Sequence, residues 1–271
     1  MPVIGIHKPV GVTSHQVAIR LSQKWKCPVT HSGILDPMAE GVLVLLAGAE
    51  SKNRQAEFQS GLKTYRFETL FGFSTDSYDA LGLVSRKKGY PPSRFPVGRL
   101  REEVARWTAR ARQAIPPFSA KVIKGRPLFW WARQGRLKEI GPSFRKIRIE
   151  SARLVSIETI EKEALARKIT RAIGKVEGDF RQDAILGKWK KALGNHPNRK
   201  FIAARIEMRV SGGTYIRSIA HDLGRAMGIP AFALGIKRTQ SGDIRIRDCV
   251  PFEEAIRVLS PGELKKKQRP T

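Results

Sequence analysis

The stretch "THSGILDPMAEGVL" (Thr30–Leu43) runs directly into the apolar segment "VLVLLAG" (Val42–Gly48). A short apolar run of this length favours a buried strand over a helix. Just before it stands Asp36, an acid between a leucine and a proline. An aspartate before a proline is a good helix N-cap, because a proline at the first helical position lacks only an N–H that the helix does not use. A catalytic carboxylate is the alternative, and the residue types alone leave both interpretations open.

Two further segments alternate apolar and polar residues, as half-buried strands do. In "KTYRFETLFG" (Lys63–Gly72), every second residue from Tyr65 onward belongs on one face. "FIAARIEMRV" (Phe201–Val210) alternates in the same way, and "SGGTYIRSIAHDLGRAMG" (Ser211–Gly228) follows with apolar residues at helical spacing. The second region therefore predicts a strand, a tight glycine turn and a helix.

Arg217 falls in the first turn of this predicted helix. A cation at that end opposes the helix dipole, which indicates an anionic partner or a functional role. A structural salt bridge to a nearby acid is the simpler explanation, and both remain open at this point.

The 271-residue chain carries 51 Lys and Arg against 24 Asp and Glu, a formal net charge of +27. Such an excess of positive charge favours nucleic acid as the partner. An anionic membrane surface would attract the same charge, but the sequence contains no long apolar stretch, signal peptide or lipidation motif. We therefore expect a soluble, cytoplasmic protein.

Neither a metal nor a cofactor is expected. The two cysteines, Cys27 and Cys249, have no metal-ligand or CxxC spacing, and the five histidines are scattered. The sequence also contains no Walker-type loop and no GxGxxG motif for a nucleotide.

The remaining segments complete the predicted organisation. The basic, Pro- and Gly-rich stretch Val84–Gly98 is predicted to be an exposed loop, and Arg99–Arg112 has helical spacing. Ile160–Lys200 predicts two helices around a break, with eleven basic and five acidic residues from Glu161 onward. We expect a charged excursion from the core there. In "LFWWAR" (Leu128–Arg133), packing of one buried and one half-buried tryptophan is favoured over base stacking.

Seven motifs follow one another in a fixed order: "HKPVGVTS" (His7–Ser14), "HSGILDPMAEGVL" (His31–Leu43), "GAESK" (Gly48–Lys52), "KTYRFETLFGFSTDSYDALG" (Lys63–Gly82), "PPFSA" (Pro116–Ala120), "SGGTYIRSIAHDLG" (Ser211–Gly224) and "GIKRTQSG" (Gly235–Gly242). Together they closely resemble the TruB family, the tRNA pseudouridine-55 synthases, with its patterns KPxGxTS, HxGxLDPxAxGVL, TDTxDxxG and GTYIRS. The resemblance implies an α/β fold of the α+β type, with a mixed, mainly antiparallel sheet flanked by helices and loops. It also implies the isomerisation of a T-loop uridine, position 55 of tRNA, to pseudouridine.

The resemblance assigns roles to the matching positions. Asp36 is the catalytic aspartate, Tyr65 is the aromatic residue packed on the target base, and Arg217 is the ion-pair partner of Asp36. The expected substrate-binding residues are His31, which helps to displace the target base, Tyr215, Ile236 in place of the usual leucine, Lys63, and Lys8 of the "KP" pair, which supports the site more than it reacts. Catalysis is then the favoured role of Asp36, although capping and catalysis can coexist.

The implied chemistry suits these residue types. Pseudouridine forms when N1–C1′ breaks, the uracil rotates and C5–C1′ forms, so the reaction needs a carboxylate and no external reagent or metal. Attack of Asp36 on C1′, attack on C6 and removal of the C2′ proton remain open. The uridine must leave its stack, and Tyr65 on a strand offers the flipped base a flat partner.

Three features depart from the family pattern. Lysine stands at Lys121, while Val122 occupies its usual place, and Phe118 replaces a common tyrosine. The PUA-like RNA-binding domain usual at the C-terminus does not follow the catalytic region. Ile160–Lys200 is longer than the family pattern. We therefore expect a catalytic domain over residues 1–255, with a basic loop at 84–98 and a helical insertion at 160–200, and a short basic tail over 256–271.

The missing domain suggests that the insertion binds RNA, with Lys188, Lys190 and Lys191 contacting phosphates. The expected enzyme is a monomer that binds the T-arm and elbow of tRNA. One alternative is a non-catalytic RNA-binding or RNA-folding protein, for which the charge alone suffices. Another is a guide-RNA-dependent synthase working in a multi-protein particle, which needs a PUA domain to hold its guide.

Overall fold

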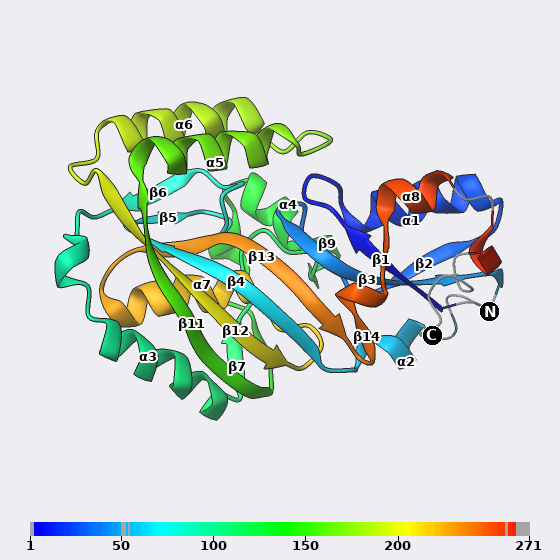
Figure 1. Ribbon diagram of the computed structural model, residues 1–271. Helices are drawn as coiled ribbons and strands as arrows, with labels where there is room; N and C mark the ends of the chain where they lie inside the picture. Colours follow the sequence, from blue (N-terminus) through cyan, green and yellow to red (C-terminus); the bar gives the residue numbers. More distant parts are fainter. Residues whose placement is uncertain (1–2, 50–52, 54, 258–259, 264–271) are drawn as a thin grey trace.

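One large sheet carries most of the motifs (Figure 1). The computed structural model describes residues 3–49, 53, 55–257 and 260–263. Within these residues, nine strands pair in the large sheet. Its strands follow the order β11 (Ile149–Glu161), β12 (Lys200–Val210), β4 (Lys63–Phe71), β13 (Ala231–Ser241), β3 (Ala39–Ala47), β1 (Val3–Lys8) and β15 (Val250–Pro251), with β2 (Val29–Ser32) paired to β3 and β14 (Ile244–Arg245) paired to β13.

The sheet is mixed and mainly antiparallel, which confirms the fold that the resemblance implied. β13 runs parallel to β3, and β1 runs parallel to β15, while the other pairs in the sheet are antiparallel. β3 confirms the strand predicted from the apolar segment. Eight of its nine residues are buried, because strands flank it on both edges and packing covers both of its faces.

The helix N-cap interpretation of Asp36 is wrong. A turn follows Asp36, in which the Ala39 N–H donates a 3.0 Å hydrogen bond to the Asp36 carbonyl, and β3 begins at Ala39. A strand forms here because β1 and β13 supply hydrogen-bonding partners for both edges of β3. Tertiary pairing thus outweighs the local Asp-Pro signal.

Shorter elements surround the sheet. The helices are α1 (Ser14–Trp25), α2 (Gln55–Gln59), α3 (Val97–Arg106), α4 (Leu128–Arg133), α5 (Lys162–Gly174), α6 (Gln182–Gly194), α7 (Ile216–Met227) and α8 (Phe252–Arg257). The short strands are β5 (Phe73–Thr75), β6 (Val84–Lys87), β7 (Arg112–Ala114), β8 (Val122–Ile123), β9 (Arg126–Pro127) and β10 (Phe144–Lys146), and the 3-10 turns are η2 (Pro92–Arg94), η3 (Trp107–Ala109), η4 (Leu137–Glu139) and η5 (Ile246–Asp248). No helix in the described part of the chain has the length and apolar character needed to cross a membrane.

One face of the sheet packs against α3 and α7. The alternating residues of β4 and β12 are buried there with Leu223 of α7 and Leu100 of α3. This arrangement confirms both predicted strands and the strand, turn and helix that end in α7. The helix predicted to reach Arg112 ends at Arg106 instead, because Arg112 to Ala114 pair as β7 with β10.

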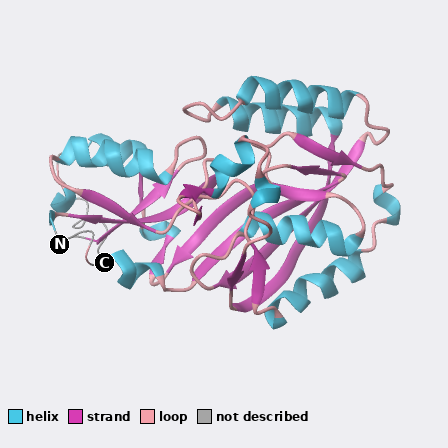
Figure 2. Ribbon diagram, turned by 180° about the vertical axis from the view of Figure 1, so that it is seen from behind, coloured by secondary structure: helices cyan, strands magenta, loops and turns pink. Residues whose placement is uncertain are grey.

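The opposite face is covered by α5 and α6, which lie side by side above the sheet (Figures 1 and 2). The two predicted helices are confirmed, but the expectation that they leave the core is wrong. Leu165, Ile169 and Trp189 are fully or almost fully buried in a second apolar cluster that includes Leu70 of β4 and Phe232 of β13. The hairpin is therefore a structural layer with charged residues on its outer surface.

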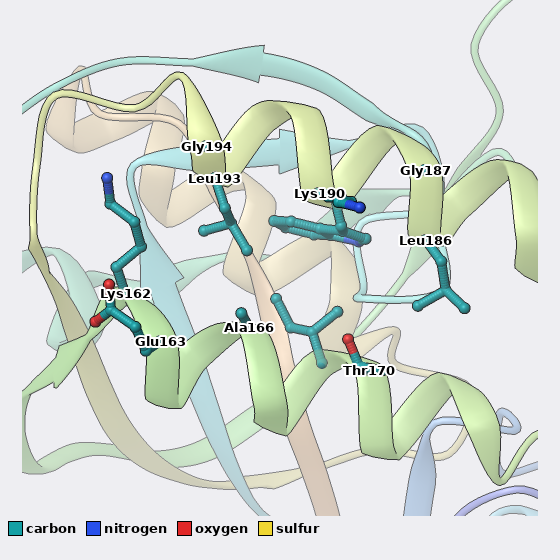
Figure 3. Close-up of a pocket in the computed structure, with 11 residues that line it drawn as sticks. Lys162, Glu163, Ala166, Thr170, Leu186, Gly187, Lys190, Leu193 and Gly194 are labelled. Carbon is teal, nitrogen blue, oxygen red and sulfur yellow. The ribbon is translucent and has the colours of Figure 1, made fainter.

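A groove of about 480 Å³ lies between α5 and α6, lined mainly by apolar side chains such as Ala166, Leu186 and Leu193 (Figure 3). All of its lining residues belong to the hairpin, and none is a predicted site residue.

The other sequence expectations are met in part. The stretch 84–98 is mostly exposed, but β6 forms an edge pair with β5, and Phe95 is buried against Phe71 at 4.9 Å between ring centroids. Trp131 is buried and Trp130 half-buried, which confirms the packing interpretation. The motif "GAESK" lies partly, and the tail 256–271 mostly, outside the described residues.

Candidate active site

The loop between β2 and β3 presents Asp36, and the N-terminal motif holds this loop in place. The Leu35 N–H donates a 2.8 Å hydrogen bond to the Ser14 hydroxyl oxygen, and the Gly11 N–H donates one of 2.8 Å to the Pro37 carbonyl. Gly33 has a φ of +89°, a region that suits glycine and lets the chain turn back toward the sheet. The Asp36 side chain remains 33% exposed, so its carboxylate is accessible from outside.

Arg217 forms the predicted ion pair with Asp36. Its Nε and Nη2 donate hydrogen bonds of 2.8 and 2.9 Å to the two carboxylate oxygens, a bidentate arrangement that fixes the carboxylate plane. The side chain is 3% exposed, and its remaining N–H groups donate to the carbonyls of Ser77 and Phe118 at 2.7 and 2.9 Å. Burial lowers the pKa of Arg217, but the carboxylates of Asp36 and Asp79 outweigh this and raise it above its ordinary value.

Asp79, which was not among the predicted site residues, is a second acid at this arginine. Its Oδ2 lies 3.7 Å from Arg217 Nε, and its side chain is only 6% exposed. Burial raises the pKa of Asp79 to about 6, although Arg217, the Ser77 hydroxyl and the Leu81 N–H all act to lower it. The residues of "STDSYDALG" are typical of a turn, so the sequence did not indicate that Asp79 pairs with a cation. The available signal was the cation in the first turn of α7.

The raised pKa of Asp79 predicts a pH-dependent stability. Between the ordinary pKa of an aspartate, 3.8, and about 6, the folded protein binds the Asp79 proton more tightly than the unfolded chain. This contribution to stability is therefore complete below pH 3.8 and is lost as the pH rises through 6. Asp79→Asn should remove the dependence, and urea unfolding of both proteins between pH 4 and 7 measures it. Parallel pH profiles for the parent and the variant would contradict the assignment.

Tyr65 lies on β4, on the face that also carries Ile236 of β13 and Leu35 of the Asp36 loop. It is 6% exposed, and its hydroxyl accepts a 3.3 Å hydrogen bond from Nη1 of Arg238. Arg238 is buried as well, and it also donates to the carbonyls of Ile34 at 3.3 Å and Val42 at 2.6 Å. Arg238 thus connects Tyr65 to the Asp36 loop, a role that the motif "GIKRTQSG" did not reveal.

Tyr215 and His31 are two further residues that the sequence predicted for the site. Tyr215 is the residue before α7, and its backbone exchanges hydrogen bonds with the side chain of Gln113. His31 lies in β2, and burial, together with His15 and Arg238, lowers the pKa of its imidazole. Nδ1 of His31 is buried inside the protein.

Lys8 and Lys63 occupy supporting positions inside the protein. The Lys8 ammonium donates to the carbonyls of Pro9 and Val12, at 2.8 and 2.7 Å, and the Lys63 ammonium donates to those of Gln59 and Gly61, each at 2.8 Å. Burial lowers the pKa of Lys8 to about 7 and that of Lys63 to about 8. Both ammonium groups are engaged with backbone carbonyls, which suits the supporting role expected of Lys8, and substrate binding by either lysine stays a prediction.

The connection between α5 and α6 reaches the same site through Arg181. Its Nη1 lies 3.2 Å from the Asp76 carboxylate, and its guanidinium lies 4.6 Å from the centre of the Phe118 ring. The Phe118 carbonyl in turn accepts a hydrogen bond from Arg217. Trp189 of α6 also donates to the carbonyl of Ala80, at 3.0 Å, so the hairpin supports the loop that carries Asp79.

The described residues contain no group of three His, Cys, Asp or Glu side chains arranged to hold a metal ion. The chemistry available to the site comes from a partly exposed carboxylate that a buried guanidinium holds in place.

Comparisons with known proteins identify the family of this chain. The family model described as the N-terminal domain of TruB family pseudouridylate synthases matches residues 21–178. The protein named tRNA pseudouridine synthase B of Aquifex aeolicus is 32% identical over 95% of this chain and 74% of its own length, and the one of Moorella thermoacetica is 30% identical over 97% and 72%. The chain belongs to the TruB family of pseudouridylate synthases.

Solved structures support the fold. A crystal structure of a Cbf5–Nop10–Gar1 complex contains a chain that matches with a TM-score of 0.55 and 18% identity, and that of the archaeal box H/ACA sRNP Nop10–Cbf5 complex contains one with 0.52 and 18%. Each match covers 98% of this chain but only 58% of the solved chain. At this identity, the likeness extends to the fold alone.

Proposed function

We propose that this chain is a tRNA pseudouridine synthase that converts a T-loop uridine, position 55 of tRNA, to pseudouridine. The observation that carries the proposal is the bidentate pair of Arg217 with the partly exposed Asp36. The relatives named tRNA pseudouridine synthase B and the net charge of +27 favour tRNA as the substrate. The proposed enzyme acts as a monomer in the cytoplasm, without metal or cofactor.

The reaction is an isomerisation, so its atoms balance without a co-reactant. The N1–C1′ bond breaks, the uracil turns, the C5–C1′ bond forms, and a proton leaves C5 while N1 gains one. In this proposal Asp36 acts on the sugar or the base as nucleophile or proton acceptor, and Arg217 holds its carboxylate in one orientation. Because Arg217 engages both oxygens, the orientation is set before the substrate arrives.

The target uridine has to leave its stack to reach Asp36, and Tyr65 is proposed to receive the base. β4 lies between β12 and β13, so the backbone under Tyr65 is held on both edges. Arg238 contacts the tyrosine hydroxyl and so helps to hold the ring, which is the group that we propose contacts the uracil. His31 and Ile236 are proposed to border the same base.

Tyr65→Leu should slow turnover more than it weakens RNA binding. Leucine keeps apolar bulk at this position but removes the aromatic face, and stacking of one base on an aromatic residue contributes about 1–3 kcal/mol. Single-turnover rates and tRNA affinities measure the two effects separately. Tyr65→Phe is the matched variant that keeps the ring and loses only the hydroxyl that Arg238 contacts. A single-turnover rate for Tyr65→Leu equal to that of the parent would remove Tyr65 from the proposed site.

Mapping pseudouridines on a tRNA transcript treated with the purified protein tests the function directly. The expected result is one new pseudouridine in the T-loop, formed with no guide RNA and no second protein. A protein that binds the transcript but forms no pseudouridine would support the non-catalytic RNA-binding alternative. Activity that requires an added guide RNA would support the guide-dependent alternative.

A further inference from the structure

The outer face of α5 carries a row of three cations that the site described above does not use. Arg167 and Arg171 lie four residues apart on α5, Lys175 follows after four more as the C-cap of the helix, and we name these three residues the α5 stripe. Four residues of helix rise by about 6 Å, so the three side chains neighbour one another along one face. All three are exposed.

No acid neutralises the α5 stripe among the described residues, since none of the ion pairs found there includes one of its members. The neighbouring Lys168, by contrast, is paired with Glu68. Like charges four residues apart destabilise a helix, so this arrangement is unfavourable for the isolated protein. An anionic ligand with repeated charges would offset that repulsion.

The α5 stripe lines a groove of about 360 Å³, together with Lys168, Ala164, Ala172 and Val10. Val10 belongs to the motif "HKPVGVTS", so one wall of the groove is the loop that follows β1. Figures 1 and 2 both show the C-terminal end of α5 beside this loop. The groove therefore joins the insertion to the most N-terminal part of the site.

Backbone contacts continue from the end of the α5 stripe to the catalytic loop. Gly11 has a φ of +113°, and a Cβ there would collide with the Lys175 carbonyl oxygen, so the two backbones touch. The Glu177 N–H donates a 3.0 Å hydrogen bond to the Gly11 carbonyl, and the Gly11 N–H donates to the carbonyl of Pro37, the residue after Asp36. Gly11 thus contacts both Lys175 and the Asp36 loop.

We propose that the α5 stripe and its groove bind the sugar–phosphate backbone of the RNA strand that leads to the target uridine. The inference rests on the proposed function in taking RNA as the ligand. A repeating anion matches three evenly spaced cations, and phosphate contacts position an RNA without reading its sequence. We therefore place the RNA contact on α5 and not on the lysines of α6, because Lys188, Lys190 and Lys191 do not line this groove.

Two variants with equal loss of charge test the proposal. The first replaces the α5 stripe, as Arg167→Gln, Arg171→Gln and Lys175→Gln, and the second replaces Lys188, Lys190 and Lys191 with glutamine on α6. Each variant lowers the net charge by three, from +27 to +24, and glutamine has nearly the same helix propensity as arginine and lysine. Affinity for one tRNA transcript is measured over a salt series from about 0.05 to about 0.5 M, because binding through phosphate contacts weakens steeply as salt rises.

The α5 stripe variant should lower the slope of log affinity against log salt by about 2 to 3, and bind about 100-fold more weakly at low salt. The α6 variant should lower the slope by less than about one. A larger change for the α6 variant would overturn the proposal and place the contact on α6, as the sequence analysis expected. Equal changes in slope for the two variants would show that only net charge matters, which would overturn the proposal. A slope and an affinity equal to those of the parent for the α5 stripe variant would exclude the site.

The binding measurement stays separate from the proposed function. Circular dichroism melting shows whether each variant is folded, and pseudouridine formation by the parent protein shows whether the catalytic proposal stands. A parent that forms no pseudouridine but whose affinity depends on the α5 stripe would overturn the enzyme proposal and support the RNA-binding groove.

Discussion

Asp36→Asn is expected to abolish pseudouridine formation and to leave tRNA affinity within a few-fold of the parent. Loss of a side chain that takes part in the chemistry typically lowers turnover by a factor of about 10⁴ or more. The amide is nearly the same size as the carboxylate and can still accept one hydrogen bond from Arg217, but it is a much weaker nucleophile and base. Single-turnover assays at saturating tRNA give the rate, and filter binding gives the affinity.

The fold should survive this substitution. Asp36 is 33% exposed, and Arg217 keeps Asp79 at 3.7 Å and the carbonyls of Ser77 and Phe118 as partners. Asp243→Asn, at an exposed turn position, is the matched control for the loss of one negative charge. Turnover by Asp36→Asn at the rate of the Asp243→Asn control would show that Asp36 has only a structural role.

Arg217→Met is expected to have the second large effect, on both stability and turnover. Removing one partner of a buried ion pair typically costs about 3–5 kcal/mol, because the other charge stays buried without compensation. Here that charge is Asp79, which is 6% exposed, whereas Asp36 can turn toward solvent. Turnover should fall as well, because nothing then holds the Asp36 carboxylate plane. Urea unfolding measures the stability and a single-turnover assay the rate.

A double variant separates the two effects of Arg217. In Arg217→Met with Asp79→Asn, the uncompensated buried charge is gone, so most of the lost stability should return. Turnover should not return, because Asp36 still lacks the guanidinium that orients it. The four proteins form a double-mutant cycle, and the coupling between Arg217 and Asp79 should be about 1–3 kcal/mol. If the changes in the free energy of unfolding caused by the two substitutions simply add, Asp79 and Arg217 do not interact, and the proposed buried network is wrong.

Local pattern predicted most elements of the large sheet that carry the site. The period-two alternation of β4 and β12 and the helical spacing of α7 follow directly from which residues face the apolar core, so they are visible in the sequence. The ends of the helices and strands were harder to predict from the sequence. The helix predicted from Arg99 to Arg112 ends at Arg106, where the turn η3 follows, and Arg112 pairs with β10 in a contact that local spacing does not encode.

The α5–α6 hairpin shows a different limit. Its charge suggested an excursion into solvent, yet Leu165, Ile169 and Trp189 anchor it on the sheet. Composition averages over all faces of a helix, whereas burial depends on the one face that meets the sheet. The fold, and not the net charge of the segment, decided which residues became core.

By itself, the sequence determined the motif order, the main strands and the first-turn cation at Arg217, together with its need for an anion. The family resemblance named Asp36 as this anion, but only the tertiary structure brought it to Arg217 and added Asp79 as a second acid. Asp36 lies 181 positions away along the chain, and Asp79 arrives on a third loop that reads locally as a turn. The tertiary structure also decided that Lys8 and Lys63 bind backbone carbonyls and that Arg238 connects Tyr65 to the Asp36 loop. Periodicity reports which face of an element is buried, but meetings between distant loops depend on strand order and register, which arise only when the whole sheet assembles.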